Sequence, residues 1–170
     1  MVDDVSHLLK KYHAIEFGEF RLASGQTSTY YVDIKRAMTQ PELLGLIGRV
    51  VTERFAFDCI AGVAVGGVPL AVAVSLASGK PYAIIRATEK DHGKSSLIIG
   101  DVAGRHVLLI EDVTTSGGSA YYGVEELRQA GASVDSVITV VDREQGAESY
   151  LAEHGIQLIS LVRVSDLLAK

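Results

Sequence analysis

Short apolar runs recur along the last two thirds of the chain, with longer mixed stretches between them. The runs are CIAGVAV (59–65), YAIIR (82–86), VLLIED (107–112), SVITVVD (136–142) and IQLISLV (156–162). Most are continuously apolar rather than alternating, which is typical of parallel strands covered on both faces. Helical patterns over 69–78, 119–130 and 145–154 lie between most of them. This alternation predicts an α/β fold with a central, mostly parallel sheet flanked by helices.

The first forty residues have a different pattern. Val5, Leu8, Leu9 and Tyr12 have helical spacing, and residues 20–33 are rich in Ser, Thr, Gly and Tyr, which predicts short strands or a hairpin. An amphipathic helix is expected to open at Pro41, because proline favours the first helical position. We therefore expect a small N-terminal lobe over 1–40 and one compact α/β core over 41–170.

Composition narrows the classes of protein. The 170 residues are 48% hydrophobic and carry a net charge of −5, which suits one domain with a real core and disfavours nucleic acid as the main partner. One cysteine, Cys59, lies in an apolar run, so we expect a buried inert thiol with neither disulfide nor zinc site. No apolar run approaches the roughly 20 residues that span a bilayer, and the N-terminus lacks a secretory h-region. These features predict a cytoplasmic protein with no membrane partner.

The stretch IEDVTTSGGSA (110–120) carries the chemistry. Glu111 and Asp112 end a strand, and six small residues then lead into a helix, with Ser119 expected as its N-cap. Small residues let backbone N–H groups approach an anion, and a helix N-terminus adds partial positive charge. The carboxylates would repel phosphate, so they fit either a ribose diol or a cation such as Mg²⁺. Together these features describe a ribose 5-phosphate site.

Two other segments bear on this site. GVAVGG (62–67) lacks the spacing of a dinucleotide or P-loop motif, but Gly66 and Gly67 can form a second anion-facing turn before a helix near Pro69. The segment ATEKDHGKSS (87–96) is polar and has almost no large apolar group, so it is expected to be a mobile surface loop.

At these residues the chain resembles a known family. VLLIEDVTTSGGSA is similar to the 5-phosphoribosyl-1-diphosphate (PRPP) motif of type I phosphoribosyltransferases. FRLASGQTSTYYVD (20–33), RATEKDHGK (86–94) and VVDREQGA (140–147) resemble three further segments of the orotate phosphoribosyltransferases, in the same order. The resemblance implies the type I phosphoribosyltransferase fold, with residues 1–40 as a hood that helps to bind the base and 41–170 as the PRPP-binding core.

The resemblance also implies roles for individual residues. Asp112, with Glu111, would meet the ribose hydroxyls, and the diphosphate would be contacted by Arg86, Lys90 and His92. Orotate would be contacted by Thr115, Arg143, Ser24, Tyr30 and Tyr31. The remaining residues expected to bind PRPP are the loop and turn positions Val113, Thr114, Thr115, Ser116, Gly117, Gly118, Ser119 and Gly66.

The implied activity is transfer of the phosphoribosyl group of PRPP to orotate, giving orotidine 5′-monophosphate and diphosphate in pyrimidine biosynthesis. Lys90, His92 and Asp112 are the expected catalytic residues, with Lys90 either stabilising charge or donating a proton. Mg²⁺ would be bound mainly through PRPP, and the polar loop would be shared across a homodimer. Ala23, Ala87 and Gly66 stand where some relatives have lysine, and Lys35 where relatives have arginine. A purine-base phosphoribosyltransferase and a non-catalytic PRPP-sensing regulator are the alternatives.

Overall fold

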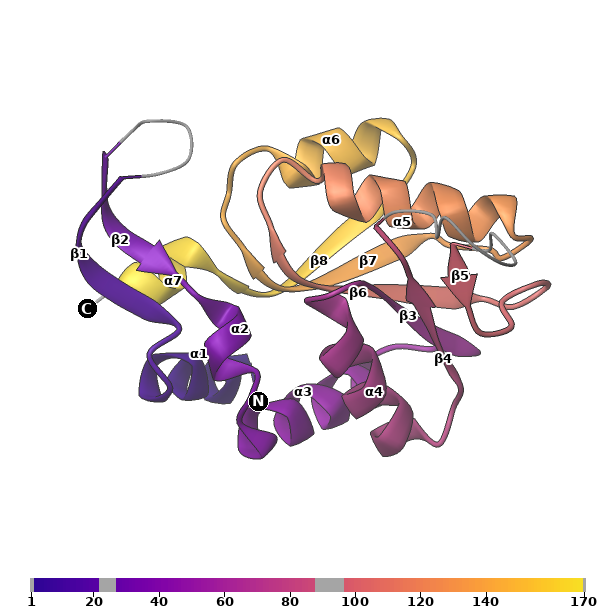
Figure 1. The fold of residues 1–170 in the computed structure, drawn as a ribbon, viewed down its shortest axis with the longest axis horizontal. Coiled ribbons are helices and arrows are strands. Elements are labelled where there is room, and N and C mark those ends of the chain that lie inside the picture. The colour runs from indigo at the N-terminus through magenta and orange to yellow at the C-terminus, as the bar shows by residue number, and fades with distance from the viewer. Residues whose placement is uncertain (1, 22–26, 88–96, 170) are drawn as a thin grey trace.

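The structure is a computed structural model that describes residues 2–21, 27–87 and 97–169 (Figure 1). Its centre is a six-stranded sheet in the order β5-β4-β3-β6-β7-β8. Every neighbouring pair is parallel except the edge pair β4–β5. The strands are β3 (Cys59–Val63), β4 (Tyr82–Ile85), β5 (Ile98–Ile99), β6 (Val107–Thr114), β7 (Ser136–Asp142) and β8 (Gln157–Arg163).

All five apolar runs of the sequence are strands of this sheet, so the predicted parallel sheet is confirmed. All five residues of β3 are buried, as are the first six residues of β6, which is why these strands show no alternation. The prediction did not include β5, because two residues are too few to produce a periodic pattern.

Helices cover both faces of the sheet, as predicted. α3 (Pro41–Arg54) and α4 (Gly67–Ser78) lie on one face, while α5 (Gly118–Gln129) and α6 (Ala147–Glu153) lie on the other (Figure 1). The side chains of β6 alternate between two apolar clusters, with Leu108 and Ile110 on the α3/α4 side and Val107 and Leu109 on the α5/α6 side. None of the helices within the described part of the chain has the length and apolar content needed to cross a bilayer.

The N-terminal segments form a second layer of structure beside the sheet. Strands β1 (Ile15–Arg21) and β2 (Thr27–Val32) pair antiparallel as the expected hairpin, between α1 (Val2–Lys11) and α2 (Ile34–Ala37). Helix α7 (Val164–Leu168) follows β8 and lies behind this hairpin in the view of Figure 1. α1 buries Val5 and Leu9 in the same cluster as α3. The division at residue 40 stays a prediction.

The strand order fixes where a ligand can enter. β3 leads through α4 to β4 on one side, and β6 leads through α5 to β7 on the other. Because these two neighbouring strands connect in opposite directions, their carboxyl ends border a crevice where open α/β sheets bind ligands. Residues 64–66 and 115–117 follow those two strand ends, and the peptide bond between Ala64 and Val65 is cis.

Candidate active site

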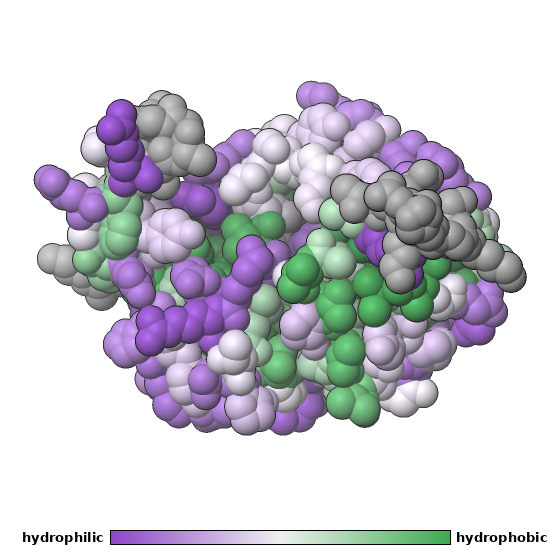
Figure 2. All heavy atoms as spheres, in the orientation of Figure 1, coloured by the Kyte–Doolittle hydropathy of each residue, from purple (hydrophilic) through white to green (hydrophobic). Residues whose placement is uncertain are grey.

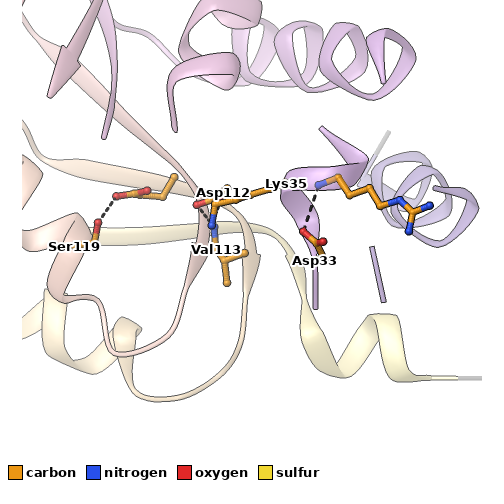
Figure 3. Close-up of polar contacts among 7 residues, drawn as sticks. Asp33, Lys35, Asp112, Val113 and Ser119 are labelled. Atoms are coloured by element: carbon orange, nitrogen blue, oxygen red, sulfur yellow. Dashed lines mark hydrogen bonds and ion pairs between the residues drawn. The ribbon is translucent and has the colours of Figure 1, made fainter. Parts of the chain in front are cut away.

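Two buried carboxylates stand at the end of β6, beside the crevice. Glu111 is 4% exposed and Asp112 is 8% exposed. Successive residues of a strand point to opposite faces, so the two acids have different neighbours. Glu111 faces α5, where the Ser119 hydroxyl donates a hydrogen bond to its Oε1 at 3.0 Å. Asp112 faces the turn before α4, and in the close-up it lies between Ser119 and Lys35 (Figure 3).

Burial changes the acidity of Glu111. The pKa of this carboxyl is raised to about 7, mainly by loss of hydration and also by the negative charge of Asp112, while the Ser119 hydroxyl and the Lys35 ammonium oppose the shift. Glu111 therefore exchanges its proton close to neutral pH. A carboxyl in this condition can accept a hydrogen bond from a sugar hydroxyl or donate one to it.

Asp112 has one satisfied oxygen and one open oxygen. Its Oδ1 accepts a hydrogen bond from the backbone N–H of Val113 at 2.9 Å. Its Oδ2 is buried and accepts no hydrogen bond within the described part of the chain, although the Lys35 Nζ lies 3.7 Å away. Buried polar atoms are rarely left without a partner. The open oxygen is therefore placed to accept a hydrogen bond from a ligand.

The turn before α4 is shaped around Asp112. Gly66 is buried at the N-terminus of α4, and a Cβ at this position would lie 2.3 Å from Asp112 Oδ2. The glycine turn and the acidic strand end are therefore in contact. The absence of a side chain at residue 66 leaves the space that the carboxylate occupies.

The loop after β6 differs from the prediction in one respect. Gly117, with φ of 88°, is the N-cap of α5, so the expectation that Ser119 caps this helix is wrong. Ser119 instead lies in the first turn and donates to the nearby carboxylate of Glu111, a stronger acceptor than a neutral group. No side chain of the described residues caps α5, and Thr115, Ser116, Gly118 and Ser119 are exposed. Uncapped N–H groups beside exposed hydroxyls are the kind of donors that suit an anion.

Arg143 follows the neighbouring strand β7 and is tied to this loop. Its backbone N–H donates to the Thr114 carbonyl at 2.9 Å. The buried Asp142 Oδ1 accepts from the Thr114 hydroxyl at 3.4 Å and from the Glu144 N–H at 3.0 Å. Glu144 in turn accepts from the Ser165 N–H at the start of α7, a contact that lowers the pKa of Glu144. These bonds hold the Arg143 backbone beside Thr114, where the small-residue loop begins.

The guanidinium of Arg143 has an open donor. Its Nε is buried and donates no hydrogen bond within the described residues. A planar donor fork with an unused N–H suits a planar anion. The sequence analysis did not identify Asp142 as the residue that orients the turn after β7. The sequence could have indicated this role, because an acid at the end of a strand directly precedes Arg143.

The other expected site residues are placed as follows. Arg86 follows β4, its N–H donates to the Leu97 carbonyl and its carbonyl accepts from Tyr122 Oη at 3.0 Å. Tyr30 and Tyr31 lie on β2, where Tyr31 is 46% exposed and its ring centroid lies 5.6 Å from that of Phe20. Lys90, His92 and Ser24 lie outside the described residues, as does nearly all of the polar loop.

Two simpler expectations concern reactive groups. Cys59 is buried and burial raises the pKa of its thiol, as expected for an inert cysteine. Within the described ranges, no group of three or more His, Cys, Asp or Glu side chains is arranged to hold a metal ion.

Comparison with known proteins gives first the class: residues 40–154 match the family model of the phosphoribosyl transferase domain. The chain is 65% identical to the orotate phosphoribosyltransferase of Methanocorpusculum labreanum, over 99% of this chain and 100% of the relative. It also superposes on a crystal structure of the Mycobacterium tuberculosis orotate phosphoribosyltransferase with a TM-score of 0.86 and 32% identity, covering 98% and 99% of the two chains. The chain therefore belongs to the orotate phosphoribosyltransferase family.

A second structure of the Mycobacterium tuberculosis enzyme bears on the ligand. That protein was solved in complex with 5-phospho-alpha-D-ribosyl 1-diphosphate, and it matches this chain with a TM-score of 0.80 and 31% identity, over 96% of this chain and 98% of the other. The predicted fold class is confirmed by these superpositions, and the 65% identical relative favours neither the purine-base nor the regulator alternative.

Proposed function

We propose that this protein transfers the 5-phosphoribosyl group of PRPP to orotate, forming orotidine 5′-monophosphate and diphosphate in pyrimidine biosynthesis. The observation that carries the proposal is one arrangement at the crevice. Buried Asp112 with an open Oδ2, an uncapped small-residue loop, and Arg143 with an open Nε all stand at adjacent strand ends. A diol acceptor, a phosphate cradle and a planar cation are what a phosphoribosyl donor and an anionic base require.

The role of each group follows from its chemistry. Asp112 accepts hydrogen bonds from the ribose hydroxyls, with Glu111 assisting. Thr114 and the exposed loop residues hold the 5′-phosphate through backbone N–H groups and through the hydroxyls of the exposed residues, with Thr115 also reaching orotate. Arg143 pairs with the carboxylate or a ring carbonyl of orotate. In the reaction, the C1–O bond breaks and its electron pair leaves with diphosphate, while a ring nitrogen of orotate bonds to C1 and the proton that it loses passes to the departing diphosphate.

The acidic pair also assists the difficult step. Cleaving the C1–O bond builds positive charge on the ribose ring, and a carboxylate held in a buried site stabilises that charge without reorganising. Glu111, whose pKa lies at about 7, gains negative charge as the pH rises through neutrality. Asp112 and deprotonated Glu111 are thus the groups of β6 that favour the transition state.

The diphosphate is proposed to meet Arg86, Lys90 and His92. Support for Lys90 and His92 comes from the motif RATEKDHGK alone, since both lie outside the described residues. Cations at this place would stabilise negative charge on the leaving group. Ser24, Tyr30 and Tyr31 are proposed to surround the base, and their support is the motif FRLASGQTSTYYVD. Closure of the polar loop would keep water from PRPP.

Mg²⁺ is the proposed cofactor, bound mainly through PRPP. The carboxylates of β6 are hard oxygen donors, and one or two carboxylates plus substrate phosphates are the usual ligands of Mg²⁺. The open Oδ2 of Asp112 fits such a shared site. When bound, the metal neutralises charge on the departing diphosphate.

A homodimer that shares the polar loop is a further part of the proposal. Apolar side chains gather over α4 on the face shown in Figure 2. A groove of about 490 Å³ runs between α3 and α4, and Leu76 in its lining is 82% exposed. An apolar face of this kind is typical of an interface between copies of a chain.

A cytoplasmic location is proposed because PRPP and orotate are charged and cross membranes poorly.

The test is an absorbance assay of orotate consumption with PRPP and Mg²⁺, omitting each component in turn. We expect turnover only with the complete mixture, and none when adenine or hypoxanthine replaces orotate. Asp112→Asn should weaken PRPP binding, while Asp101→Asn, a change at an exposed carboxylate paired with Arg105, should leave it unchanged. Turnover of a purine base in place of orotate would refute the proposed substrate, and unchanged PRPP affinity in Asp112→Asn would refute the diol assignment.

A further inference from the structure

Lys35 lies beside the site, outside the set of residues that bind PRPP or orotate in the proposed reaction. It projects from α2, its side chain is 70% exposed, and its Nζ lies 3.7 Å from Asp112 Oδ2 (Figure 3). A cavity of about 240 Å³ opens next to this pair. It is lined by Lys35, Met38, Thr39, Val65, Gly66 and Pro69. The lysine therefore shares one cavity with the glycine turn and reaches the buried carboxylate.

The contact between Lys35 and Asp112 is not a fixed structural bond. At 3.7 Å it is longer than a hydrogen bond, and among the residues that the structure describes none donates a hydrogen bond to Oδ2. An exposed lysine in an ion pair of this kind contributes little to stability and keeps its rotamer freedom. A stable link would have brought the ammonium within hydrogen-bond distance of the buried oxygen.

The backbone that carries Lys35 is, by contrast, well anchored. Ile34 and Ala37 are buried in the core, and the Asp33 carboxylate accepts a hydrogen bond from the Arg36 N–H at 3.3 Å. A long flexible cation on a fixed short helix can swing within the cavity while its origin stays in place. This arrangement suits a group that changes partner when a ligand arrives.

The stereochemistry of PRPP indicates the second partner. In the alpha anomer, the diphosphate at C1 lies on the same face of the ribose ring as the two hydroxyls. A cation beside the carboxylate that holds those hydroxyls is therefore on the diphosphate side of the ring. The incoming base approaches C1 from the opposite face, so orotate is the less accessible anion for this lysine.

We propose that Lys35 is a PRPP-binding residue that moves from Asp112 to the diphosphate when the substrate binds. This inference rests on the proposed function and adds a residue to it. In the free protein Lys35 offsets the charge of Asp112. With PRPP bound, the ribose hydroxyls satisfy Asp112, and the ammonium pairs with diphosphate oxygens and stabilises the charge that they gain as the C1–O bond breaks.

The experiment compares Lys35→Ala and Lys35→Arg with the neighbouring change Arg36→Ala. Arg36 is also exposed on α2, but it pairs with Glu16. We expect Lys35→Ala to raise the KM for PRPP about 10- to 100-fold, the range for losing a charged contact, with the KM for orotate changed less than about threefold. Lys35→Arg should recover most of the affinity because it keeps the charge, and Arg36→Ala should match the wild type.

Calorimetric binding of two ligands separates the diphosphate from the sugar. Lys35→Ala should weaken binding of Mg²⁺–PRPP but leave ribose 5-phosphate binding almost unchanged, because the latter has no diphosphate. Equal weakening of both ligands would show that Lys35 acts only by positioning Asp112, and unchanged PRPP binding would show no role; either result overturns the inference. A wild-type protein that binds PRPP but does not consume orotate would instead refute the proposed function alone.

Discussion

Gly66→Ala is the change that most directly tests the contact between the glycine turn and the acidic strand end. Gly66 has φ of −63° and ψ of −39°, a conformation that alanine adopts without strain. The added methyl group would lie 2.3 Å from Asp112 Oδ2 and 2.4 Å from its Cγ. Any effect of the substitution must therefore come from this collision and not from the backbone.

The size of the effect follows from those distances. Ordinary van der Waals contact begins at 3.4 Å, so the carboxylate must retreat by about 1 Å. A displacement of about 1 Å in a group that positions substrate can lower the rate about 10²-fold. We expect kcat/KM for PRPP to fall by about that factor in Gly66→Ala, with the thermal unfolding midpoint lowered by only a few degrees.

Initial rates at varied PRPP and fixed orotate give the required constants. Gly45→Ala is the steric control, because a Cβ there would lie 3.6 Å from the end of the Arg49 side chain and would cause no collision; since Gly45 lines the proposed interface groove, light scattering should first show the same oligomeric state as the wild type. In an Asp112→Ala background, Gly66→Ala should have little further effect, since the colliding group is gone. A Gly66→Ala enzyme within about twofold of the wild type would contradict the reasoning.

Four further predictions address the other parts of the site. In the folded protein the pKa of Glu111 is about 7, against 4.5 for an ordinary Glu carboxyl. Between these two pH values the folded state therefore binds more protons than the unfolded state, and its free energy of unfolding falls as the pH rises. The free energy of unfolding of Glu111→Gln, relative to that of the wild type, should therefore rise by up to about 3 kcal/mol between about pH 4.5 and about pH 8. A difference between the two proteins that does not change with pH in urea titrations would contradict this. Arg143→Lys should raise the KM for orotate about tenfold or more, because a lysine lacks the planar fork, and an unchanged KM would remove Arg143 from the base site. Lys90→Ala should lower kcat about 10²-fold or more with an unaltered circular dichroism spectrum, and an unchanged kcat would exclude a catalytic role. Leu76→Glu places a charge on a side chain that is 82% exposed in the apolar groove, so light scattering should show a dimer becoming a monomer, and a monomeric wild type would refute the interface.

Sharing of the polar loop between subunits has its own test. If Lys90 of one subunit completes the site of the other, a mixture of Lys90→Ala and Asp112→Asn proteins forms hybrid dimers in which one site has neither change. Such a mixture should recover about a quarter of the wild-type activity, although each variant alone is nearly inactive. A mixture as inactive as its components would contradict loop sharing.

Much of the fold could be predicted from local patterns. Continuous apolar runs gave the five long strands of the sheet, since a strand buried on both faces has no place for polar residues. Pro41 marked the first residue of α3, because its fixed φ and missing N–H suit that position. The short strand β5 and the exact start of α5 were not predicted, because two residues carry no period and a left-handed glycine can end a loop earlier than a serine cap.

The candidate site divides in the same way. The sequence by itself determined that two acids and a small-residue loop share a strand end, and hence the pairing of a diol acceptor with a phosphate cradle, because those groups are neighbours in the chain. Only the tertiary structure decided that Glu111 faces Ser119 while Asp112 faces Gly66 and Lys35. The reason is that these contacts join residues from strands and helices distant in sequence, and the order of the strands and the alternation of side chains across the sheet bring them together.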